Sequence, residues 1–152
     1  MPEAVTAREI TVTRVLDAPR ELVWSAFTEP GRLASWWGPP GWSTDPAEVT
    51  MDVRAGGEFS LTSVSDAGER MPMVAVYREV AEPERIVLEE PAESSWHEGA
   101  VTEVTLTDLG DGRTELTLRS TVHTTDEMAG HAEGGMNASV DRLAELVARG
   151  GR

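Results

Sequence analysis

The chain has 152 residues, of which 39% are hydrophobic, and its formal net charge at pH 7 is −14. A chain of this length typically forms one domain, so we expect a single domain over residues 1–152. The negative charge argues against nucleic-acid binding, and no apolar run approaches the roughly 18 residues that span a bilayer. Because the sequence contains no cysteine, it excludes disulfides and thiolate metal sites.

The first part of the chain predicts one strand and two short helices. Residues 8–16 alternate apolar residues with threonines, which is typical of a strand. Residues 17–21 then open a helix that runs to residue 27, because Pro19 suits the first turn and acids there favour the helix dipole. A turn at residues 28–31 ends this helix and starts a second, in which Leu33 belongs to the apolar face.

The middle of the chain predicts antiparallel strands. Residues 49–53 form one strand, and residues 58–64 and 70–80 form a hairpin around an Asp-Ala-Gly turn. In 70–80, apolar residues occupy both parities, so we expect this strand to be covered on both faces. Pro83 ends it, and residues 85–89 form a fifth strand.

A second hairpin follows a loop. We expect residues 91–99 to form that loop, where Trp96 and its neighbours either line a pocket mouth or form a solvated turn. Residues 101–108 and 113–123 then flank a Leu-Gly-Asp-Gly turn, a strong hairpin signal.

The C-terminal segment predicts a long amphipathic helix. Thr124 and Glu127 match a capping box. Apolar residues recur on one face at steps of three and four: Met128, Ala132, Met136, Val140, Leu143 and Val147. Three glycines weaken the first half by about 1 kcal/mol each relative to alanine, so we expect secure helix only over about 136–149. The whole pattern predicts an α+β domain in which the helix packs on the concave face of a curved sheet.

Four segments together resemble a known family. They are the strand and helices ending in Trp-Trp (residues 10–37), the Arg-x-Gly-Gly-x-Phe bend (52–59), a strand ending in Pro-x-Arg-Ile (74–87) and the final helix (135–146). Over roughly residues 8–148, which we expect to form the core of the domain, the chain resembles the SRPBCC or START-like (Bet v 1-like) superfamily, and more closely the branch named after the activator of Hsp90 ATPase homologue 1. This implies a helix-grip fold, in which about six or seven antiparallel strands wrap around the long helix and leave a cavity.

One position departs from that family. It commonly has tryptophan after the glycine of the last helix, where this chain has Met136. The resemblance implies that this position faces the cavity. Since methionine is flexible, we expect a differently shaped pocket, and the ligands of relatives do not carry over.

The segment Ser35–Trp42, SWWGPPGW, holds three of the five tryptophans. Its prolines and glycines favour a non-regular path at low entropy cost. Adjacent residues rarely face the same way, so we expect one of Trp36 and Trp37 to pack beneath the loop and the other to line the cavity. Core or lid packing alone also explains tryptophans there.

Three functions are compatible with the sequence. The first is binding of a small apolar or amphipathic molecule, in which ligand contacts come from aromatic, methionine and histidine side chains: Trp36, Trp37, Trp42, Phe59, Met71, Met73, Tyr77, Trp96, His123, Met128 and Met136. The second is a cavity-based enzyme, a cyclase, aromatase or hydrolase of polyketide type, with acid or base groups among Glu58, Tyr77, Arg119 and His123. The third is a co-chaperone role, as the family name suggests.

The remaining expectations concern partners and location. Glu115, Arg119 and His123 share one strand parity and either form a polar cavity wall or face solvent. No histidine pair has metal-site spacing, so we expect no metal and no cofactor. A homodimer is compatible with the sequence. The N-terminal stretch has no basic segment followed by an apolar one, so we expect a cytoplasmic protein.

Overall fold

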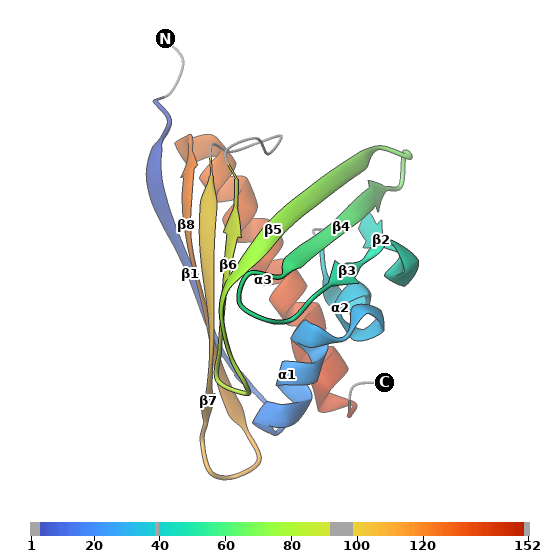
Figure 1. Cartoon of the computed structure of the whole chain (residues 1–152), viewed down its shortest axis with the longest axis vertical. Coiled ribbons are helices and arrows are strands. Elements are labelled where there is room, and N and C mark those ends of the chain that lie inside the picture. The colour runs from blue at the N-terminus through green and yellow to red at the C-terminus, as the bar shows by residue number, and fades with distance from the viewer. Residues whose placement is uncertain (1–3, 39, 92–98, 151–152) are drawn as a thin grey trace.

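The computed structural model describes residues 4–38, 40–91 and 99–150. Figure 1 shows a curved antiparallel sheet, a long C-terminal helix across it and two short helices at one end. The elements in chain order are β1 (Thr6–Leu16), α1 (Arg20–Thr28), α2 (Pro30–Trp36), β2 (Trp42–Thr44), a 3₁₀ turn (Pro46–Glu48), β3 (Thr50–Met51), β4 (Glu58–Ser65), β5 (Arg70–Ala81), β6 (Arg85–Glu90), β7 (Ala100–Asp108), β8 (Thr114–Thr124) and α3 (Asp126–Ala148).

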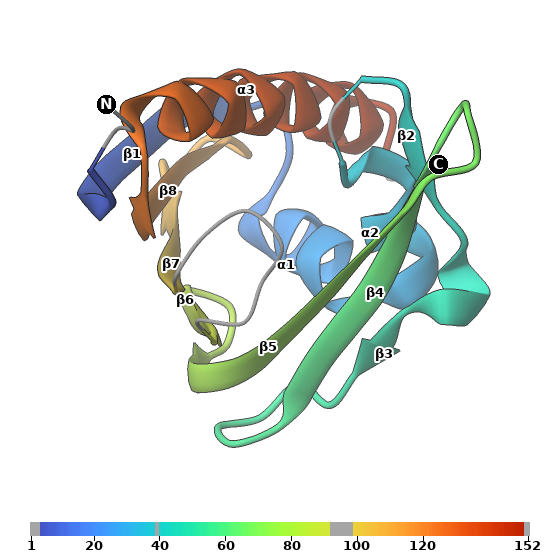
Figure 2. The same ribbon diagram turned by 90° about the horizontal axis from the view of Figure 1, so that it is seen from above.

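The sheet has the order β1-β8-β7-β6-β5-β4-β2, and the short β3 pairs with β4 as an eighth strand. In Figure 2 it curls around the interior from β1 to β4, while α3 lies along the open side. The predicted α+β helix-grip fold is therefore confirmed. The strand predicted at 49–53 shortens to Thr50–Met51, and Trp42, expected in irregular structure, begins β2. No helix among the described residues is long and apolar enough to cross a membrane.

Helix α3 begins earlier than predicted. Its N-cap is Thr125, whose hydroxyl accepts a hydrogen bond from the Met128 amide, and Asp126 and Glu127 lie in its first turn. The predicted capping box was one residue off, because Thr124 is the last residue of β8. The side-chain cap and the acidic residues near the positive end of the helix dipole stabilise the first turn. The helix therefore begins before its glycines and continues through them.

The two halves of α3 pack differently. From Ser139 onward the apolar stripe is buried, with Val140, Leu143 and Val147 in the main core. Between residues 126 and 138 no side chain is fully buried. The second half of α3 therefore anchors the helix in the core, whereas the first half lies above a space between the helix and the sheet.

The expectation that β5 is covered on both faces was wrong. Ala75 and Tyr77 are buried, whereas Val74 and Val76 are 50% and 43% exposed. The sheet is a single layer, and α3 covers only its concave face (Figure 2). Apolar residues of the other parity therefore face outward on the convex side.

The Gly-Gly bend before β4 is required by a close backbone approach. A Cβ on Gly57 would lie 1.9 Å from the Asp52 carbonyl oxygen, and Gly56 has φ +86°. Two backbone hydrogen bonds join the bend to β5: Gly56 N donates to the Tyr77 carbonyl at 2.8 Å and Tyr77 N donates to the Gly57 carbonyl at 2.9 Å. The bend thereby holds Tyr77 in position.

Two glycines of α3, in contrast, have no steric reason to be glycine. A Cβ at Gly130 or Gly134 would meet nothing within 4 Å. Replacing both with alanine should raise the free energy of unfolding by about 1 kcal/mol per site, because alanine loses less backbone entropy in a helix. Urea denaturation followed by circular dichroism measures this. Gly56→Ala is the control and should destabilise, since its positive φ strains a side chain; an unchanged midpoint in the double variant would contradict the expectation.

Candidate ligand-binding cavity

A cavity of about 630 Å³ lies between the sheet and α3. Its walls come from the concave faces of β1 and β4–β8, from α1, α2 and the segment that joins α2 to β2, and from α3 between Met128 and Val140. On the α3 side the lining includes the small residues Ala132 and Gly135, which leave space beneath the helix. The volume lies in the range of about 300–1,000 Å³ typical of small-molecule sites.

Most of the predicted contact residues meet in this cavity. All except Trp37, which directly follows α2, lie on one of five elements, α2, β2, β4, β5 and α3. The predicted residues that line the cavity are Trp36, Trp37, Trp42, Phe59, Met71, Met73, Tyr77, Met128 and Met136. Trp96, with the neighbouring His97, lies outside the described residues. That these side chains contact a ligand stays a prediction.

His123 lies away from the cavity. On β8 the residues that line the cavity are Leu118, Ser120 and Val122, so His123 belongs to the opposite face, where it is exposed and borders a smaller hollow of about 270 Å³. The alternative of a polar cavity wall was wrong for the same reason: Arg119 is exposed and pairs with Glu9 at 3.0 Å.

The other charged candidates also lie outside. Glu58 is exposed and accepts a hydrogen bond from the Ser60 hydroxyl at 3.1 Å. The described residues contain no group of three or more histidine, aspartate or glutamate side chains that could hold a metal ion. Of the proposed acid or base groups, only Tyr77 lines the cavity.

The adjacent tryptophans Trp36 and Trp37 both line the cavity, contrary to expectation. Trp36 ends α2 and is 2% exposed, whereas Trp37 is half-buried with extended backbone at φ −72°, ψ 138°. Because α2 ends at Trp36 and the backbone of Trp37 is extended, the two side chains are not held in the divergent directions that neighbouring residues of one helix have. Their rings meet edge to face with centroids 5.6 Å apart, and Trp37 meets Phe59 in the same way at 5.7 Å.

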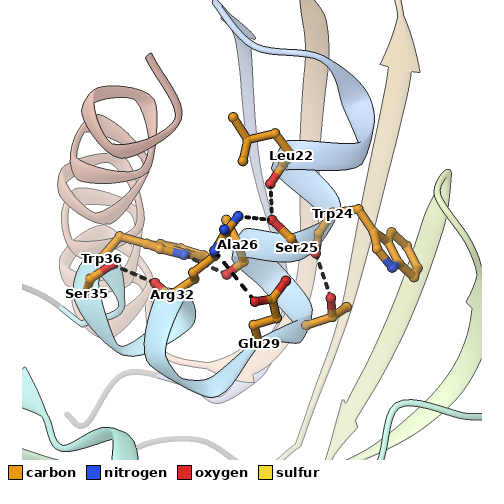
Figure 3. A network of polar contacts seen from close by, with 9 residues as sticks. Leu22, Trp24, Ser25, Ala26, Glu29, Arg32, Ser35 and Trp36 are labelled. Atoms are coloured by element: carbon orange, nitrogen blue, oxygen red, sulfur yellow. Dashed lines mark hydrogen bonds and ion pairs between the residues drawn. The ribbon is translucent and has the colours of Figure 1, made fainter. Parts of the chain in front are cut away.

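Polar contacts hold the corner between α1 and α2, as Figure 3 shows. The indole Nε1 of Trp36 donates to the Ala26 carbonyl at 2.9 Å. Arg32 Nη1 donates to the Ser25 hydroxyl at 2.6 Å, and that hydroxyl donates to the Leu22 carbonyl at 2.7 Å. The aromatic wall therefore rests on a corner that is fixed by buried and half-buried hydrogen bonds.

The loop after α2 is tied to the helix above the cavity. Gly38 adopts φ +106°, a region that favours glycine, and its carbonyl accepts a hydrogen bond from the buried Ser139 hydroxyl at 2.8 Å. Ser139 is the first buried residue of α3. This bond lies at the boundary between the anchored and the spanning half of the helix.

Polar side chains within the cavity were not predicted. The hydroxyls of Thr102 on β7 and Ser120 on β8 lie 3.0 Å apart, and those of Ser63 and Thr44 lie 3.2 Å apart. Thr102, Ser120 and Ser63 all line the cavity. The alternation of residues along β7 could have predicted that Thr102 faces the cavity, since Thr102 lies on the same face of the strand as Ala100 and Val104. Threonine is also common on the outward faces of strands, however, so this pattern alone did not identify it.

Tyr77 is a buried polar group in the cavity wall. It is 2% exposed, and its hydroxyl has no hydrogen-bond partner among the described residues. Burial, and secondarily the negative charge of Asp52, raises the pKa of Tyr77 to about 12. The phenol is therefore neutral at physiological pH, which favours a packing or hydrogen-bonding role over that of a base.

This pKa shift predicts a measurable pH dependence. Tyr77 is the chain's one tyrosine, so tyrosinate absorbance at 295 nm should rise near pH 12 in the folded protein and near pH 10 in urea. Between these values only the unfolded state loses the proton, so stability should fall with rising pH, by at most about 1.4 kcal/mol per unit. Tyr77→Phe should remove this slope; a native transition near pH 10 would contradict the prediction.

Comparisons with known proteins agree with the geometry. The family model described as activator of Hsp90 ATPase homolog 1-like protein matches residues 17–148. A solved structure from Chromobacterium violaceum is 28% identical, with TM-score 0.81 over 92% of this chain and 96% of that chain. The AHSA1 protein from Silicibacter pomeroyi is 19% identical, with TM-score 0.79 over 93% and 98% of the two chains. No curated protein matches the sequence.

Proposed function

The chain belongs to the family of activator of Hsp90 ATPase homologue 1-like proteins, and we propose that it binds a small apolar or amphipathic molecule between its sheet and α3. The cavity of about 630 Å³ carries this proposal. Its wall is predominantly aromatic and aliphatic with a few hydroxyl groups, the composition typical of small-molecule sites. The three tryptophans of the segment 36–42 form one side of that wall.

Binding is favoured over catalysis by where the predicted acid and base groups lie. Glu58, Arg119 and His123 are exposed outside the cavity, and the raised pKa keeps Tyr77 neutral. A cyclase or hydrolase needs an acid, base or nucleophile beside its substrate. Of the acid or base groups predicted from the sequence, only Tyr77 lines the cavity; Glu90 and His131 are the other ionisable side chains in the described lining.

Native mass spectrometry of freshly purified protein, compared with its denatured mass, tests the proposal directly. Extra mass that disappears on denaturation shows an occupied cavity and gives the size of the ligand. A bare protein is then titrated with the neutral dye N-phenyl-1-naphthylamine, followed by its fluorescence. A protein that carries no extra mass and takes up no dye contradicts the proposal.

Met136 provides a variant that separates binding from folding. It is half-buried on the helix and lines the cavity, so Met136→Ala removes contact surface from the ligand side. We expect at least a threefold change in dye affinity, and a loss of stability below the roughly 2–5 kcal/mol of a fully buried Met→Ala change. Asn137→Ala, at an exposed neighbouring position, is the matched control. Unfolding of the Met136 variant would instead assign this side chain to the core.

A further inference from the structure

One polar part of the cavity wall is a pair of hydroxyl groups on neighbouring strands. Thr102 and Ser120 are register partners on β7 and β8, and both side chains line the cavity. Along the same strands they are flanked by Ala100 and Val104 and by Leu118 and Val122, which also line it. The pair is thus flanked by apolar side chains along both strands, and the other polar lining residues lie elsewhere in the wall: Ser63, Tyr77, Glu90, His131 and Ser139.

This pair has hydrogen-bonding capacity left over. The two hydroxyl oxygens lie 3.0 Å apart, and either can donate to the other. Each hydroxyl has one proton and two acceptor lone pairs, so their mutual bond uses only one of the two protons. Neither hydroxyl makes a further hydrogen bond within the described parts of the chain. The second proton is available to an oxygen or nitrogen acceptor inside the cavity.

The charges around the cavity select against anions. All 13 basic residues of the chain are arginines, and none of those described lines the cavity. Its ionisable lining residues in the described chain are Tyr77, Glu90 and His131. Among these only the exposed His131 offers a nitrogen that could pair with a carboxylate, so a carboxylate bound deeper in the cavity would lose its hydration uncompensated, and the net charge of −14 repels it further.

From these observations we propose that the ligand is an uncharged molecule with an apolar body and one hydrogen-bond-accepting oxygen, a carbonyl or hydroxyl, which the Thr102–Ser120 pair binds. This inference rests on the proposed function, because it assigns a chemical class to the same cavity. It excludes fatty-acid carboxylates and other organic anions as the preferred ligands. The hydroxyl pair orients the molecule, and the tryptophans and methionines enclose its apolar part.

Three probes that share a 2-dimethylaminonaphthalene body test this inference. They carry at position 6 a propionyl group (a neutral ketone), a carboxylate or a propyl group. Binding to the intact protein is followed at pH 7.5 by probe fluorescence. We expect the ketone to bind at least tenfold more tightly than the carboxylate, with an emission red shift relative to a dry apolar solvent, since a hydrogen bond to its carbonyl lowers the excited-state energy.

The double variant Thr102→Val/Ser120→Ala removes both hydroxyls and leaves neither one unpaired. It should weaken ketone binding about fivefold, shift the bound ketone's emission to the blue and leave the affinity for the propyl probe unchanged. Thr117→Val, on the opposite face of β8, is the control and should change none of these values. Circular dichroism verifies that each variant is folded, and Ser120→Ala alone replaces the double variant if that fails to fold.

The outcomes separate the inference from the function on which it rests. A carboxylate that binds as tightly as the ketone, or a ketone affinity and emission unaffected by loss of the hydroxyls, overturns the inference and leaves the binding function standing. If none of the three probes binds up to its solubility limit, the proposed function and the inference both fall.

Discussion

Replacing Trp36 with alanine should lower the free energy of unfolding by about 3–5 kcal/mol, the range for removal of a fully buried large aromatic side chain. The indole is 2% exposed, and its ring contacts those of Phe27 and Trp37 at centroid distances of 5.0 and 5.6 Å. Its Nε1–H also satisfies the Ala26 carbonyl at 2.9 Å (Figure 3). The substitution therefore removes packing area and leaves a backbone acceptor without its partner at the same time.

Urea denaturation of a graded set of variants checks this expectation. Trp36→Phe keeps most of the ring packing and loses the indole donor, so it should cost less than alanine and isolate the hydrogen bond, worth about 1–3 kcal/mol. Trp37→Ala is the matched control, because Trp37 is half-buried and its side chain makes no hydrogen bond to any residue that the structure describes. We expect it to cost about 1–2 kcal/mol. Equal losses for the two alanine variants would contradict the view that the buried Trp36 contributes more to stability than the half-buried Trp37.

Replacing Ala132 with phenylalanine should weaken binding of N-phenyl-1-naphthylamine at least tenfold while the protein stays folded. Ala132 lies in the first half of α3, lines the cavity and packs against the small cluster of Ile10, Ala100 and Val122. The larger side chain enters space that a ligand would occupy, so binding must displace it. Because the cavity of about 630 Å³ accommodates the ring, overpacking strain of about 1–3 kcal/mol is avoided.

The same substitution at an exposed site is the control for this prediction. Ala148→Phe adds a ring at the last residue of α3, where the side chain is exposed, and should leave dye affinity unchanged. Titrations of both variants and thermal melts with and without the dye measure binding and stability together. Undiminished dye affinity in the Ala132 variant would place the dye elsewhere on the protein.

Local signals predicted most of the elements correctly. The hairpin β7–β8 follows from its Gly-Asp-Gly turn, and α1 and α2 follow from their prolines and apolar spacing. Where a prediction failed, a tertiary effect was stronger than the local preference. Glycine propensity argued against helix before residue 136, whereas the Thr125 cap and the helix's position over the sheet extend α3 to Asp126.

The sequence predicted that the candidate site is an apolar pocket, but it did not predict all of the residues that line it. The abundance of tryptophan and methionine indicated an apolar pocket, and most of those side chains do line the cavity. His123 was misplaced because strand parity divides residues into two faces without saying which is concave. Thr102 and Ser120 were missed because their pairing depends on the β7–β8 register, and either residue alone resembles an ordinary strand hydroxyl.

The amino-acid sequence by itself determined the order of the elements, the apolar stripe of the last helix, the glycine bend before β4 and the family to which the chain belongs. The first three features depend on interactions between residues close together in the chain or on steric rules for single residues, and the family follows from the order and spacing of such local motifs. Tertiary structure alone decided which face of each strand encloses the cavity, which valines of β5 lie on the outside and which hydroxyls meet within the wall. The reason is physical: these outcomes depend on how α3 packs across the sheet, through contacts between residues far apart in the chain, such as those of Ala132 and Met136 with the cluster of Ile10, Ala100 and Val122.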